Sequence, residues 1–580
     1  ERSGADADLP SSAEGKVYKT YVGTEHIFNT LYVNDERATL ARTKNRTYNE
    51  RFATAMGEYM ETTGGGINYF VYKDGDLDEE AINGLVNAQK RGEMDAQIFV
   101  WDGGYWDWMT DTLPIATINP ETRRVDIKQD VNDPAKYRPK YSIGSSARYF
   151  LQGNLGFLDV AGEYYFNKTT GYLYYYPEGE ISDQEIVVPT TQKVVELKGK
   201  SLENKVRNIT FDGLQFKDSD TTEWYAYGWN WGDAGAGLGY YPPEAEGSTL
   251  PSYCEQSERA EFQVAVINMT NTEGITITNS HIKNSGMWGV DLYMGNQYTD
   301  INNCLIEYTG HGGVNLEGGY PGVGGDENGD GYNRDNKITN CLIHDMGQLV
   351  GQTAGVAVNN SSYTTISHCE IYNSPRRLVM YTAGMQRNPN VGYPDGDRDV
   401  NRMTDIYTHH NTTEYTYLHD GQQDGGDDGA FFACYLFYGQ EEYKPNYINQ
   451  VVVDRIGANP SMDDLPPCGL SNDMGCSGME ISNFQSVNTQ HMNGQLSSSQ
   501  SDGYNSKMIL NNTNIQYPYD AIIVGEKEFD PSKMEYDKIG VDWSTFPTEY
   551  VTERSDYQTV DLGPDKDEVY FEDEFESGNI

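Results

Sequence analysis

Two acidic stretches of the sequence carry carboxyl groups that could act together. One is QDGGDDGAFFA (423–433) and the other is CGLSNDMGCSG (468–478). Their candidate carboxyls are Asp424, Asp427, Asp428 and Asp473. Two carboxyl groups that meet in space can divide the work of a general acid and of a nucleophile or base. Such acidic turns can instead bind calcium or only water, so the elements that carry them decide their use.

Basic and imidazole side chains lie in the same part of the chain. Arg376 and Arg377 follow ISHCEIYNSP (366–375) directly, and a guanidinium can grip a carboxylate or sulfate with two hydrogen bonds. His410 is a candidate proton carrier in a groove, because imidazole titrates near neutral pH. The plainer alternatives are a salt bridge for the arginines and a structural role for the histidine.

One loop has the beginning of a calcium-binding pattern. In DENGDGYNRDN (326–336), the residues Asp326, Asn328 and Asp330 fit D-x-N-x-D-G. Lys337 stands where the bidentate Glu of an EF-hand would be, and no flanking helices are evident, so the loop is not an EF-hand. We expect Ca²⁺ here, either structural or bridging to substrate, and no organic cofactor.

A ten-residue phrase recurs along the chain. Its clearest copies are ITNSHIKNSG (277–286), INNCLIEYTG (301–310), ITNCLIHDMG (338–347) and ISHCEIYNSP (366–375). Further, weaker copies follow at irregular intervals, as expected for coils of constant cross-section that carry loops of variable length. The residues at the third position are Asn279, Asn303, Asn340, His368, Asn411, Gln450, Asn483 and Asn512.

These phrases predict a right-handed parallel β-helix. They are rich in Ile, Val and Thr and are broken by Gly and Asn, which indicates short strands. Asn suits the sharp bend between two strands because it tolerates the left-handed conformation. A β-propeller would show more regular repeats with four strands each. We expect Cys304, Cys341 and Cys369 to stack inside, and a disulfide between Cys468 and Cys476.

A second strand follows each phrase, as in GGVNLEGG (312–319) and AGVAVNNS (354–361). Alternation with a period of two buries the valines and places Glu317 and Asn359 on the opposite face. A row of polar and aromatic groups on that face is what a groove for a sugar chain needs. An ordinary solvated face is the alternative.

Composition limits the class of protein. The chain has 580 residues and a net charge of −46, from 42 basic and 88 acidic residues. Wrapping of DNA or RNA is excluded, because neutralising phosphates requires a basic surface. The sequence has no apolar run of about 18 residues or more, so no membrane span is expected. The polar beginning of the chain fits a mature secreted or periplasmic protein, and we expect a monomer.

The sequence divides into three parts. Residues 1–200 predict a two-part antiparallel β domain with the start of the β-helix, because 29–43 indicates strand, turn and strand and 159–179 indicates a hairpin. Residues 201–530 predict the β-helix with loops over its active face. Residues 531–580 predict an acidic cap of the last coil or a mobile tail. The fold class is all-β: a right-handed parallel β-helix with an N-terminal antiparallel β-sandwich-like domain.

The N-terminal segments also carry a family resemblance. TLYVNDERATLAR (30–42) together with LDVAGEYYFN…TGYLYYYPEG (158–179), followed by β-helix coils, resembles the secreted bacterial β-helix glycoside hydrolases of families 141 and 120. The resemblance covers most of the chain in architecture and specifies the substrate poorly. It implies hydrolysis of a xylose- or fucose-containing plant or algal polysaccharide, sulfated or not.

The resemblance extends to the two acidic stretches. QDGGDDGAFFA is similar to the Asp-Gly-Gly-Ala-Ile-Tyr segment of those hydrolases and puts Asp427 at the acidic position, although Asp428 and Phe432 stand where Gly and Tyr are usual. CGLSNDMGCSG is similar to their Gly-Ile-Tyr-Leu-Asp segment and puts Asp473 at the acidic position, with Ser-Asn in place of Tyr-Leu.

These positions lead to a specific catalytic hypothesis. We expect Asp427 to be the nucleophile or base and Asp473 the acid, on successive coils. Coils lie about 4.8 Å apart, so the two carboxyls can approach the roughly 5–5.5 Å of a retaining pair. Asp428 and Asp424 are the fallback carboxyls. Glu317 lies about three coils away and is assigned to substrate binding, with Asn359, Arg376, Arg377 and His410.

Three functions stay open. The first is a glycoside hydrolase, which releases reducing ends without ultraviolet absorbance. The second is a calcium-assisted polysaccharide lyase acting on a uronate glycan by β-elimination, whose unsaturated product absorbs in the ultraviolet. There, Arg376 or Arg377 would take the C5 proton. The third is a non-catalytic glycan-binding β-helix, which does neither. A polysaccharide or oligosaccharide is the expected partner in each case.

Overall fold

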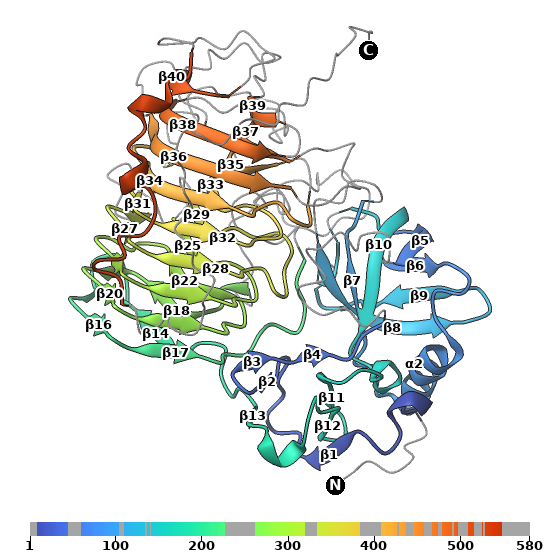
Figure 1. Ribbon diagram of the computed structural model, residues 1–580. Coiled ribbons are helices and arrows are strands. Elements are labelled where there is room, and N and C mark those ends of the chain that lie inside the picture. The colour runs from blue at the N-terminus through green and yellow to red at the C-terminus, as the bar shows by residue number, and fades with distance from the viewer. Residues whose placement is uncertain are drawn as a thin grey trace, which may run out of the picture.

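The computed structural model of the protein describes most of the β-helix and its N-terminal neighbour (Figure 1). The described residues are 8–43, 60–103, 110–133, 136–139, 141–226, 262–318, 333–382, 408–425, 428–434, 436, 445–457, 467–473, 478–489, 492–496, 508–515, 525 and 528–547. Asp326, Asn328, Asp330 and Asp427 lie outside them, so the expectations for these residues stay predictions. Within the described residues, no helix is long and apolar enough to cross a membrane.

One side of each coil belongs to a parallel sheet of nine strands. In spatial order these are β14 (Val195–Lys198), β18 (Ala265–Thr270), β22 (Trp288–Tyr293), β25 (Val314–Glu317), β29 (Val356–Asn359), β33 (Val379–Thr382), β35 (Gly429–Cys434), β37 (Cys468–Asp473) and β39 (Met492–Leu496). Their side chains alternate as predicted, and the row Val290, Val314, Val356 and Val379 is in register and buried in the core. Each coil therefore adds one strand to this sheet.

The other side of the coils is a parallel sheet of fourteen strands, which turns through a bend within each coil. Before the bend run β16 (Thr210–Asp212), β20 (Thr276–Thr278), β23 (Asp300–Asn302), β27 (Lys337–Thr339) and β31 (Thr365–Ser367). After it run β17 (Gln215–Lys217), β21 (His281–Lys283), β24 (Leu305–Glu307), β28 (Leu342–His344) and β32 (Glu370–Tyr372). The longer strands β34 (Thr412–His419), β36 (Asn446–Ile456), β38 (Met479–Thr489) and β40 (Met508–Thr513) pass through the bend. Two short parallel ladders complete the coils. One pairs β15 (Val206–Arg207) with β19 (Thr272–Glu273), and the other pairs β26 (Asn333–Arg334) with β30 (Ser361–Ser362).

The repeated Asn or His occupies this bend. Asn279, Asn303, Asn340 and His368 all have φ near +50°, which confirms the predicted left-handed conformation. The side chains also bond along the stack, since Asn303 Nδ2 donates to Asn279 Oδ1 at 3.2 Å and Asn340 Nδ2 donates to Asn303 Oδ1 at 2.7 Å. Stacked amides therefore hold successive coils in register.

One member of the predicted ladder is wrong. Tyr415, and not Asn411, takes the left-handed bend in its coil, with φ of 46°, and its ring stacks on His368 with centroids 4.9 Å apart. Asn411 belongs to a second asparagine stack at another corner, where its Nδ2 donates to Asn446 Oδ1 at 2.9 Å. The sequence misleads here because an aromatic residue stands at the bend while Asn lies four positions earlier.

The predicted cysteine stack is confirmed. Cys304, Cys341 and Cys369 are buried on neighbouring coils, and burial together with the flanking thiols raises the pKa of the Cys341 thiol. Cys468 donates its thiol to the Asp428 carbonyl at 3.5 Å. Cys468, one of the described cysteines, takes part in no disulfide, so the predicted Cys468–Cys476 disulfide is wrong.

The N-terminal region is antiparallel, as predicted, except for one parallel pair of strands, and six of its strands close into a barrel rather than a sandwich. The barrel strands are β5 (Met60–Gly65), β6 (Tyr69–Tyr72), β7 (Gln97–Val100), β8 (Asp111–Asn119), β9 (Arg124–Ile127) and β10 (Ser145–Gln152). The predicted hairpin is present as β11 (Glu163–Asn167) and β12 (Tyr172–Tyr175), in a sheet with β1 (Tyr18–Tyr21) and β4 (Thr39–Leu40). A third sheet holds β2 (Tyr32–Val33), β3 (Glu36–Arg37) and β13 (Ile186–Val187).

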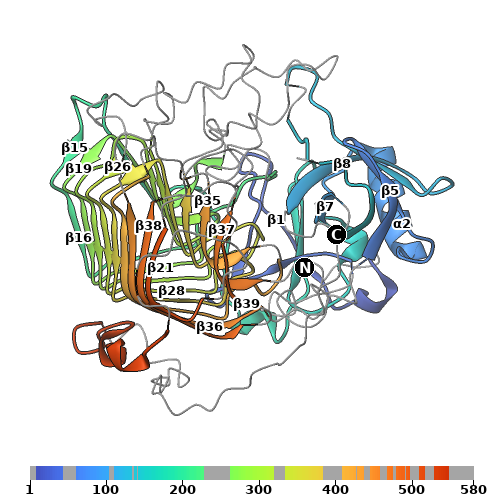
Figure 2. The same ribbon diagram turned by 90° about the horizontal axis from the view of Figure 1, so that it is seen from above.

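The sequence reasoning missed α2 (Glu79–Arg91), the one α-helix among the described residues. It follows an N-cap, Asp78, whose side chain accepts from the Ala81 N–H, and it ends at Gly92 in the left-handed conformation. Both capping signals are visible in the sequence. Figure 2 shows the barrel and α2 beside the coils of the β-helix.

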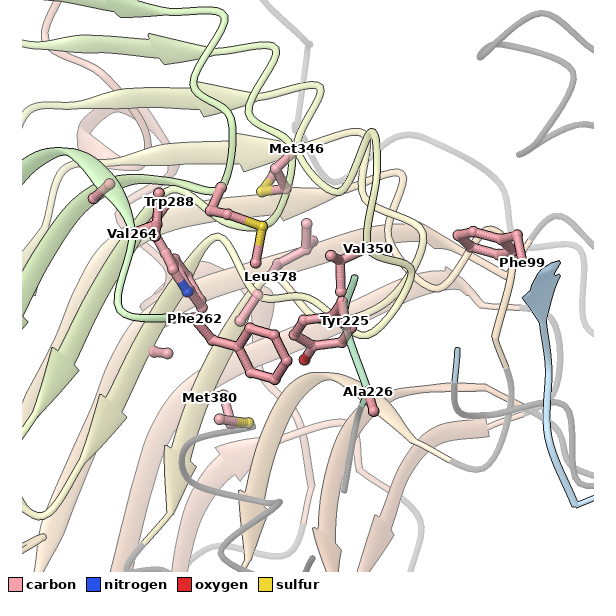
Figure 3. Close-up of a cluster of buried hydrophobic side chains, with 14 of the residues drawn as sticks. Phe99, Tyr225, Ala226, Phe262, Val264, Trp288, Met346, Val350, Leu378 and Met380 are labelled. Carbon is pink, nitrogen blue, oxygen red and sulfur yellow. The ribbon is translucent and has the colours of Figure 1, made fainter. Parts of the chain in front are cut away.

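An aromatic cluster joins the barrel to the β-helix (Figure 3). Thr112 of β8 and Tyr225 form an antiparallel bridge, with backbone N–H···O distances of 2.8 and 3.0 Å. The Tyr225 ring then lies 5.2 Å from Phe262, measured between centroids, and both are buried near Trp288 of the β-helix. The barrel is thus anchored on the first coils by both backbone and side-chain contacts.

The described part of the C-terminal segment does not cap the last coil. Residues 528–547, here called the C-terminal strap, run back along the outside of the fourteen-stranded sheet (Figure 1). Glu535 N donates to Gln450 Oε1, and Asp542 N donates to Asn340 Oδ1, three coils nearer the start of the helix. Val541 and Phe546 pack on Leu305 and Leu342.

Candidate active face of the nine-stranded sheet

The outward positions of the nine-stranded sheet form two rows, because strand pairing is in register from coil to coil. One row holds Asn268, Asp291, Asn315, Ala357, Met380, Phe432 and Ser471. The next, two residues further along each strand, holds Tyr293, Glu317, Asn359, Thr382 and Cys434, and the register position of Asp473 continues it. The polar groups are concentrated on the early coils and the apolar groups in the middle.

This face is more enclosed than the open groove we expected. Asp291 is 1% exposed, and Glu317 and Asn359 are 0% exposed. Asn359 Oδ1 accepts from Thr382 Oγ1 at 3.1 Å, one coil further on. Carboxyl groups buried in this way are costly unless hydrogen bonds compensate or protonation neutralises them.

Asp291 has the most suggestive environment. Asn268 Nδ2 donates to its Oδ2 at 3.0 Å from one neighbouring strand, and Asn315 Nδ2 donates to its Oδ1 at 2.9 Å from the other. Burial nevertheless raises the pKa of Asp291 to about 7, against the lowering effects of the Asn315 bond, the Lys193 charge and the Asn268 bond. A carboxyl with this pKa can both give and take a proton near neutral pH.

Glu317 lies diagonally across from Asp291 on the next strand. Asp291 pairs with Asn315, and Glu317 is two residues beyond Asn315. Strand spacing and residue rise separate the Cα atoms of Asp291 and Glu317 by about 8 Å. Both side chains leave the same face of the sheet, so their carboxyl groups are expected at a similar separation.

Asp428 is held by both predicted arginines. Its Oδ2 accepts from Arg376 Nε at 2.9 Å and from Arg377 Nε at 2.5 Å, and its Oδ1 accepts from the Gly429 N–H at 2.9 Å. All three side chains are at most 3% exposed. The Arg377 guanidinium also lies 4.1 Å from the centroid of the Phe432 ring. This cluster is a buried ion pair, a geometry that suits structure better than either proton transfer or substrate binding.

Asp424 connects the β-helix to the barrel. Its Oδ1 lies 3.2 Å from Nη1 of Arg148 on β10, and both side chains are buried. The Arg148 guanidinium lies over the Trp101 ring at 4.1 Å. Asp424 therefore has a ready explanation as an interdomain ion pair.

The register separates the fallback carboxyl Asp428 from Asp473. Asp473 pairs with Cys434 at the end of β35, whereas Asp428 precedes the first residue of β35. Six residues along a strand correspond to about 20 Å. The fallback carboxyl Asp428 and Asp473 therefore lie on successive coils but at different positions along the strands. Asp427 lies outside the described residues, so its pairing with Asp473 stays a prediction.

The other predicted residues lie elsewhere. His410 is at a corner between coils, where its ring stacks on Tyr363 at 4.9 Å and its Nδ1 is 2.9 Å from Nδ1 of His409. It is not in either outward row of the nine-stranded sheet. Among the described residues, no group of three or more His, Cys, Asp or Glu side chains could hold a metal ion.

Asp291 is the residue that sequence reasoning passed over. It was not singled out, because GVDLYM resembles no acidic motif. A signal was present: the equivalent positions on the two neighbouring coils are both Asn, an amide donor on each side. Stacking the repeated strands and comparing residues across coils, rather than along the chain, would have found this arrangement.

Comparison with known proteins supports the architecture. The model of the family described as "Right handed beta helix region" matches residues 255–432. A comparison with curated protein sequences finds no match. The chain thus contains a right-handed β-helix region, in agreement with the predicted fold class.

Solved structures extend the match beyond the β-helix. A structure named "Glycoside hydrolase" has a TM-score of 0.61 at 15% identity, covering 92% of this chain and 83% of that chain. The "Catalytic domain of GH87 alpha-1,3-glucanase in complex with nigerose" has a TM-score of 0.29 at 10% identity, over 86% of this chain and 88% of that chain. A variant pectate lyase from Xanthomonas campestris has a TM-score of 0.25 at 12% identity, over 46% of this chain and 66% of that chain. The first likeness shows the fold, and the other two are too weak to support an argument.

Proposed function

We propose that the protein is a carbohydrate-active enzyme that hydrolyses glycosidic bonds, with Asp291 as proton donor and Glu317 as the second carboxyl. The observation that carries this proposal is the pKa of about 7 that burial gives Asp291 between two amide donors. A general acid must hold its proton at working pH and release it during the reaction. A second carboxyl on the adjacent strand supplies the other half of the chemistry.

The proposed reaction is a single displacement. The Asp291 carboxyl donates its proton to the glycosidic oxygen as the bond from that oxygen to the anomeric carbon breaks. The Glu317 carboxylate takes a proton from a water molecule as the water oxygen bonds to the anomeric carbon. A separation of about 8 Å lies within the roughly 6.5–9.5 Å that leaves room for this water, so inversion of the anomeric centre is expected.

The geometry favours hydrolysis over the lyase alternative. A lyase base has to reach the C5 proton of a uronate, and Arg376 and Arg377 were its candidates. Both guanidinium groups instead bond to the Asp428 carboxylate. A guanidinium engaged by a carboxylate is held in its charged form, which cannot take a proton.

The resemblance to families 141 and 120 supports a xylose- or fucose-containing plant or algal polysaccharide as substrate. A polymer of this kind lies outside cells, which supports a secreted or periplasmic location. Calcium at the 326–331 loop and a monomeric state also stay predictions, and chelation and sedimentation would test them.

One incubation experiment tests the reaction class. The protein is mixed with xylans, fucose-rich sulfated glycans and uronate polymers, and both reducing ends and ultraviolet absorbance are followed. We expect reducing ends from at least one polymer without absorbance. Products that absorb in the ultraviolet would replace hydrolysis with β-elimination. If the protein binds a polymer but releases neither reducing ends nor absorbing products from any of them, the glycan-binding alternative is favoured.

A further inference from the structure

A cavity of 1910 Å³ lies away from the candidate active face. Its walls come from the N-terminal β sheets, from the outer side of the fourteen-stranded sheet and from the C-terminal strap. None of Asp291, Asn315, Glu317 and Asn359 lines it. We call it the strap cleft. Small-molecule pockets usually measure roughly 300–1,000 Å³, so the strap cleft has room for several linked rings.

Aromatic rings form one side of the strap cleft. Tyr372 is stacked between two imidazoles, with centroids 4.7 Å from His344 and 4.5 Å from His419. Tyr308 and Trp543, from the bend after β24 and from the strap, also line the cleft and are half-buried. The two imidazoles cover both faces of Tyr372, so the half-buried rings of Tyr308 and Trp543 are the ones that offer apolar surface to a ligand, at little entropic cost.

Hydrogen-bonding groups beside these rings are fixed in place. His344 Nδ1 lies 2.6 Å from Asp345 Oδ2, and its Nε2 lies 3.4 Å from Glu307 Oε2. The pattern repeats two strands further on, where His419 Nδ1 lies 2.6 Å from Asp420 Oδ2 and Nε2 lies 3.1 Å from Glu370 Oε1. Each imidazole thus bridges two carboxylates. Ionised carboxylates accept several hydrogen bonds each, so these retain acceptor capacity toward the cleft.

The charge of the lining selects the ligand class. Among the described residues, ten Asp and Glu but five Lys and Arg line the strap cleft. An anionic glycan, whether uronate or sulfated, would be repelled by this excess of negative charge. A neutral glycan carries hydroxyl donors for the carboxylates and apolar C–H faces for the rings.

We propose that the strap cleft is a second carbohydrate-binding site, which takes a neutral oligosaccharide segment of several sugar units. The ligand class rests on the proposed function, but the site is separate from the candidate active face. Bound there, one part of a polymer would keep the enzyme on its substrate while another part reaches the active face, which raises the effective concentration of substrate.

Calorimetric titration with defined hexasaccharides tests the proposal without requiring turnover. The parent protein is Glu317→Gln, which under the proposed function slows hydrolysis by roughly 10²–10⁴-fold, and its melting temperature is checked first. The ligands are xylohexaose, cellohexaose and mannohexaose, with hexagalacturonate as the anionic comparison. We expect at least one neutral hexasaccharide to bind and hexagalacturonate not to bind at the cleft.

Two substitutions remove rings from the cleft in different elements. Trp543→Ala acts on the strap, and Tyr308→Asn acts on the β-helix while suiting the left-handed backbone at φ of 53°. Each should weaken binding by about tenfold, the loss expected for one aromatic contact. Trp543→Phe should retain binding, and so should Tyr298→Ala, which removes an exposed ring (56%) elsewhere on the β-helix.

The outcomes separate this proposal from the proposed function. Unchanged affinity in both Trp543→Ala and Tyr308→Asn, or binding of none of the neutral hexasaccharides, would overturn the strap cleft as a glycan site. Tighter binding of hexagalacturonate that is lost with the same substitutions would overturn its neutral specificity. A failure to hydrolyse any polymer would defeat the proposed function but leave a positive titration intact.

Discussion

Asn315 holds Asp291 from the neighbouring strand, its Nδ2 donating to Asp291 Oδ1 at 2.9 Å. Asn268 holds the other carboxyl oxygen from the opposite side at 3.0 Å. The Asp291 side chain is therefore oriented by the two strands that flank it. Its buried position raises the pKa, and the two amides keep that rise within a range useful for proton transfer.

The first prediction is that Asp291 costs stability at neutral and higher pH. Its pKa is raised from 3.8 to about 7, so the folded state keeps a proton that the unfolded state releases between these values. Stability should therefore fall as pH rises from about 4 to about 7, in total by on the order of 4 kcal/mol from this group. Asp291→Asn should remove this decline and raise the melting temperature at pH 8. A melting temperature that falls equally in both proteins from pH 4 to 8 would contradict it.

The second prediction concerns Asn315 as a positioning residue. Its hydrogen bond lowers the pKa of Asp291, so Asn315→Ala should raise that pKa further. Because the acid must be protonated, the alkaline limb of the pH–rate profile should move to higher pH. Asn302→Ala is the matched control, since Asn302 Nδ2 donates to Thr339 Oγ1 on the other sheet. A purely structural role for Asn315 would change melting temperature while leaving the pH profile where it was.

The third prediction is that Asp428 serves stability. Asp428→Asn leaves Arg376 and Arg377 as buried charges without their carboxylate, a change that costs roughly 3–5 kcal/mol in comparable buried pairs. Urea unfolding measures the loss. The control is Glu273→Gln, which breaks the exposed pair with Arg207 at 3.3 Å and should cost no more than about 1 kcal/mol. Equal, small losses in the two variants would show that Asp428 does not hold the fold.

The fourth prediction concerns the His419–Asp420 pair. Burial alone would lower the pKa of His419, but its hydrogen bonds to Asp420 and Glu370 outweigh burial and raise the pKa above 6.5. Burial would raise the pKa of Asp420, but His419 and Arg455 lower it to about 2. The His419 contribution is thus present below pH 6.5 and is lost as pH rises through its raised pKa. The Asp420 contribution is present above about pH 4 and is lost as pH falls toward 2.

The contribution of this pair should therefore be constant between these limits, on top of the decline from Asp291, and His419→Gln should lack the pair's loss on the alkaline side. Melting temperature measured from pH 3 to 9 gives the comparison. His26→Gln, which removes an exposed imidazole, should keep the wild-type profile. Identical profiles for His419→Gln and the wild type would exclude this pair as a source of pH dependence.

The sequence predicts the coil architecture well because the repeat acts locally. Asn or His at a bend, Ile at the sixth position and Cys after the bend each depend on neighbours within a few residues. These features can therefore be predicted without knowing the structures of the loops. Tyr415 shows the limit of the pattern, since an aromatic residue takes the bend conformation once its ring can stack on His368.

The candidate site was less predictable because it depends on register between coils. Sequence motifs placed Asp427 and Asp473 on successive coils, but coil spacing fixes only the lateral distance. The offset along the strands, about 3.3 Å per residue, comes from loop lengths that no local phrase encodes. Burial is equally non-local: Asp428 is an acidic loop residue in the sequence, and only the fold brings Arg376 and Arg377 to it.

The most direct test compares turnover of four variants on a polymer that the wild type hydrolyses. Asp291→Asn and Glu317→Gln should each lower kcat by roughly 10²–10⁴-fold, the usual contribution of a general acid or base, with the fold intact. Asp427→Asn and Asp473→Asn should retain most of the turnover. The opposite result, near wild-type kcat in Asp291→Asn and Glu317→Gln with loss in Asp427→Asn or Asp473→Asn, would contradict the assignment.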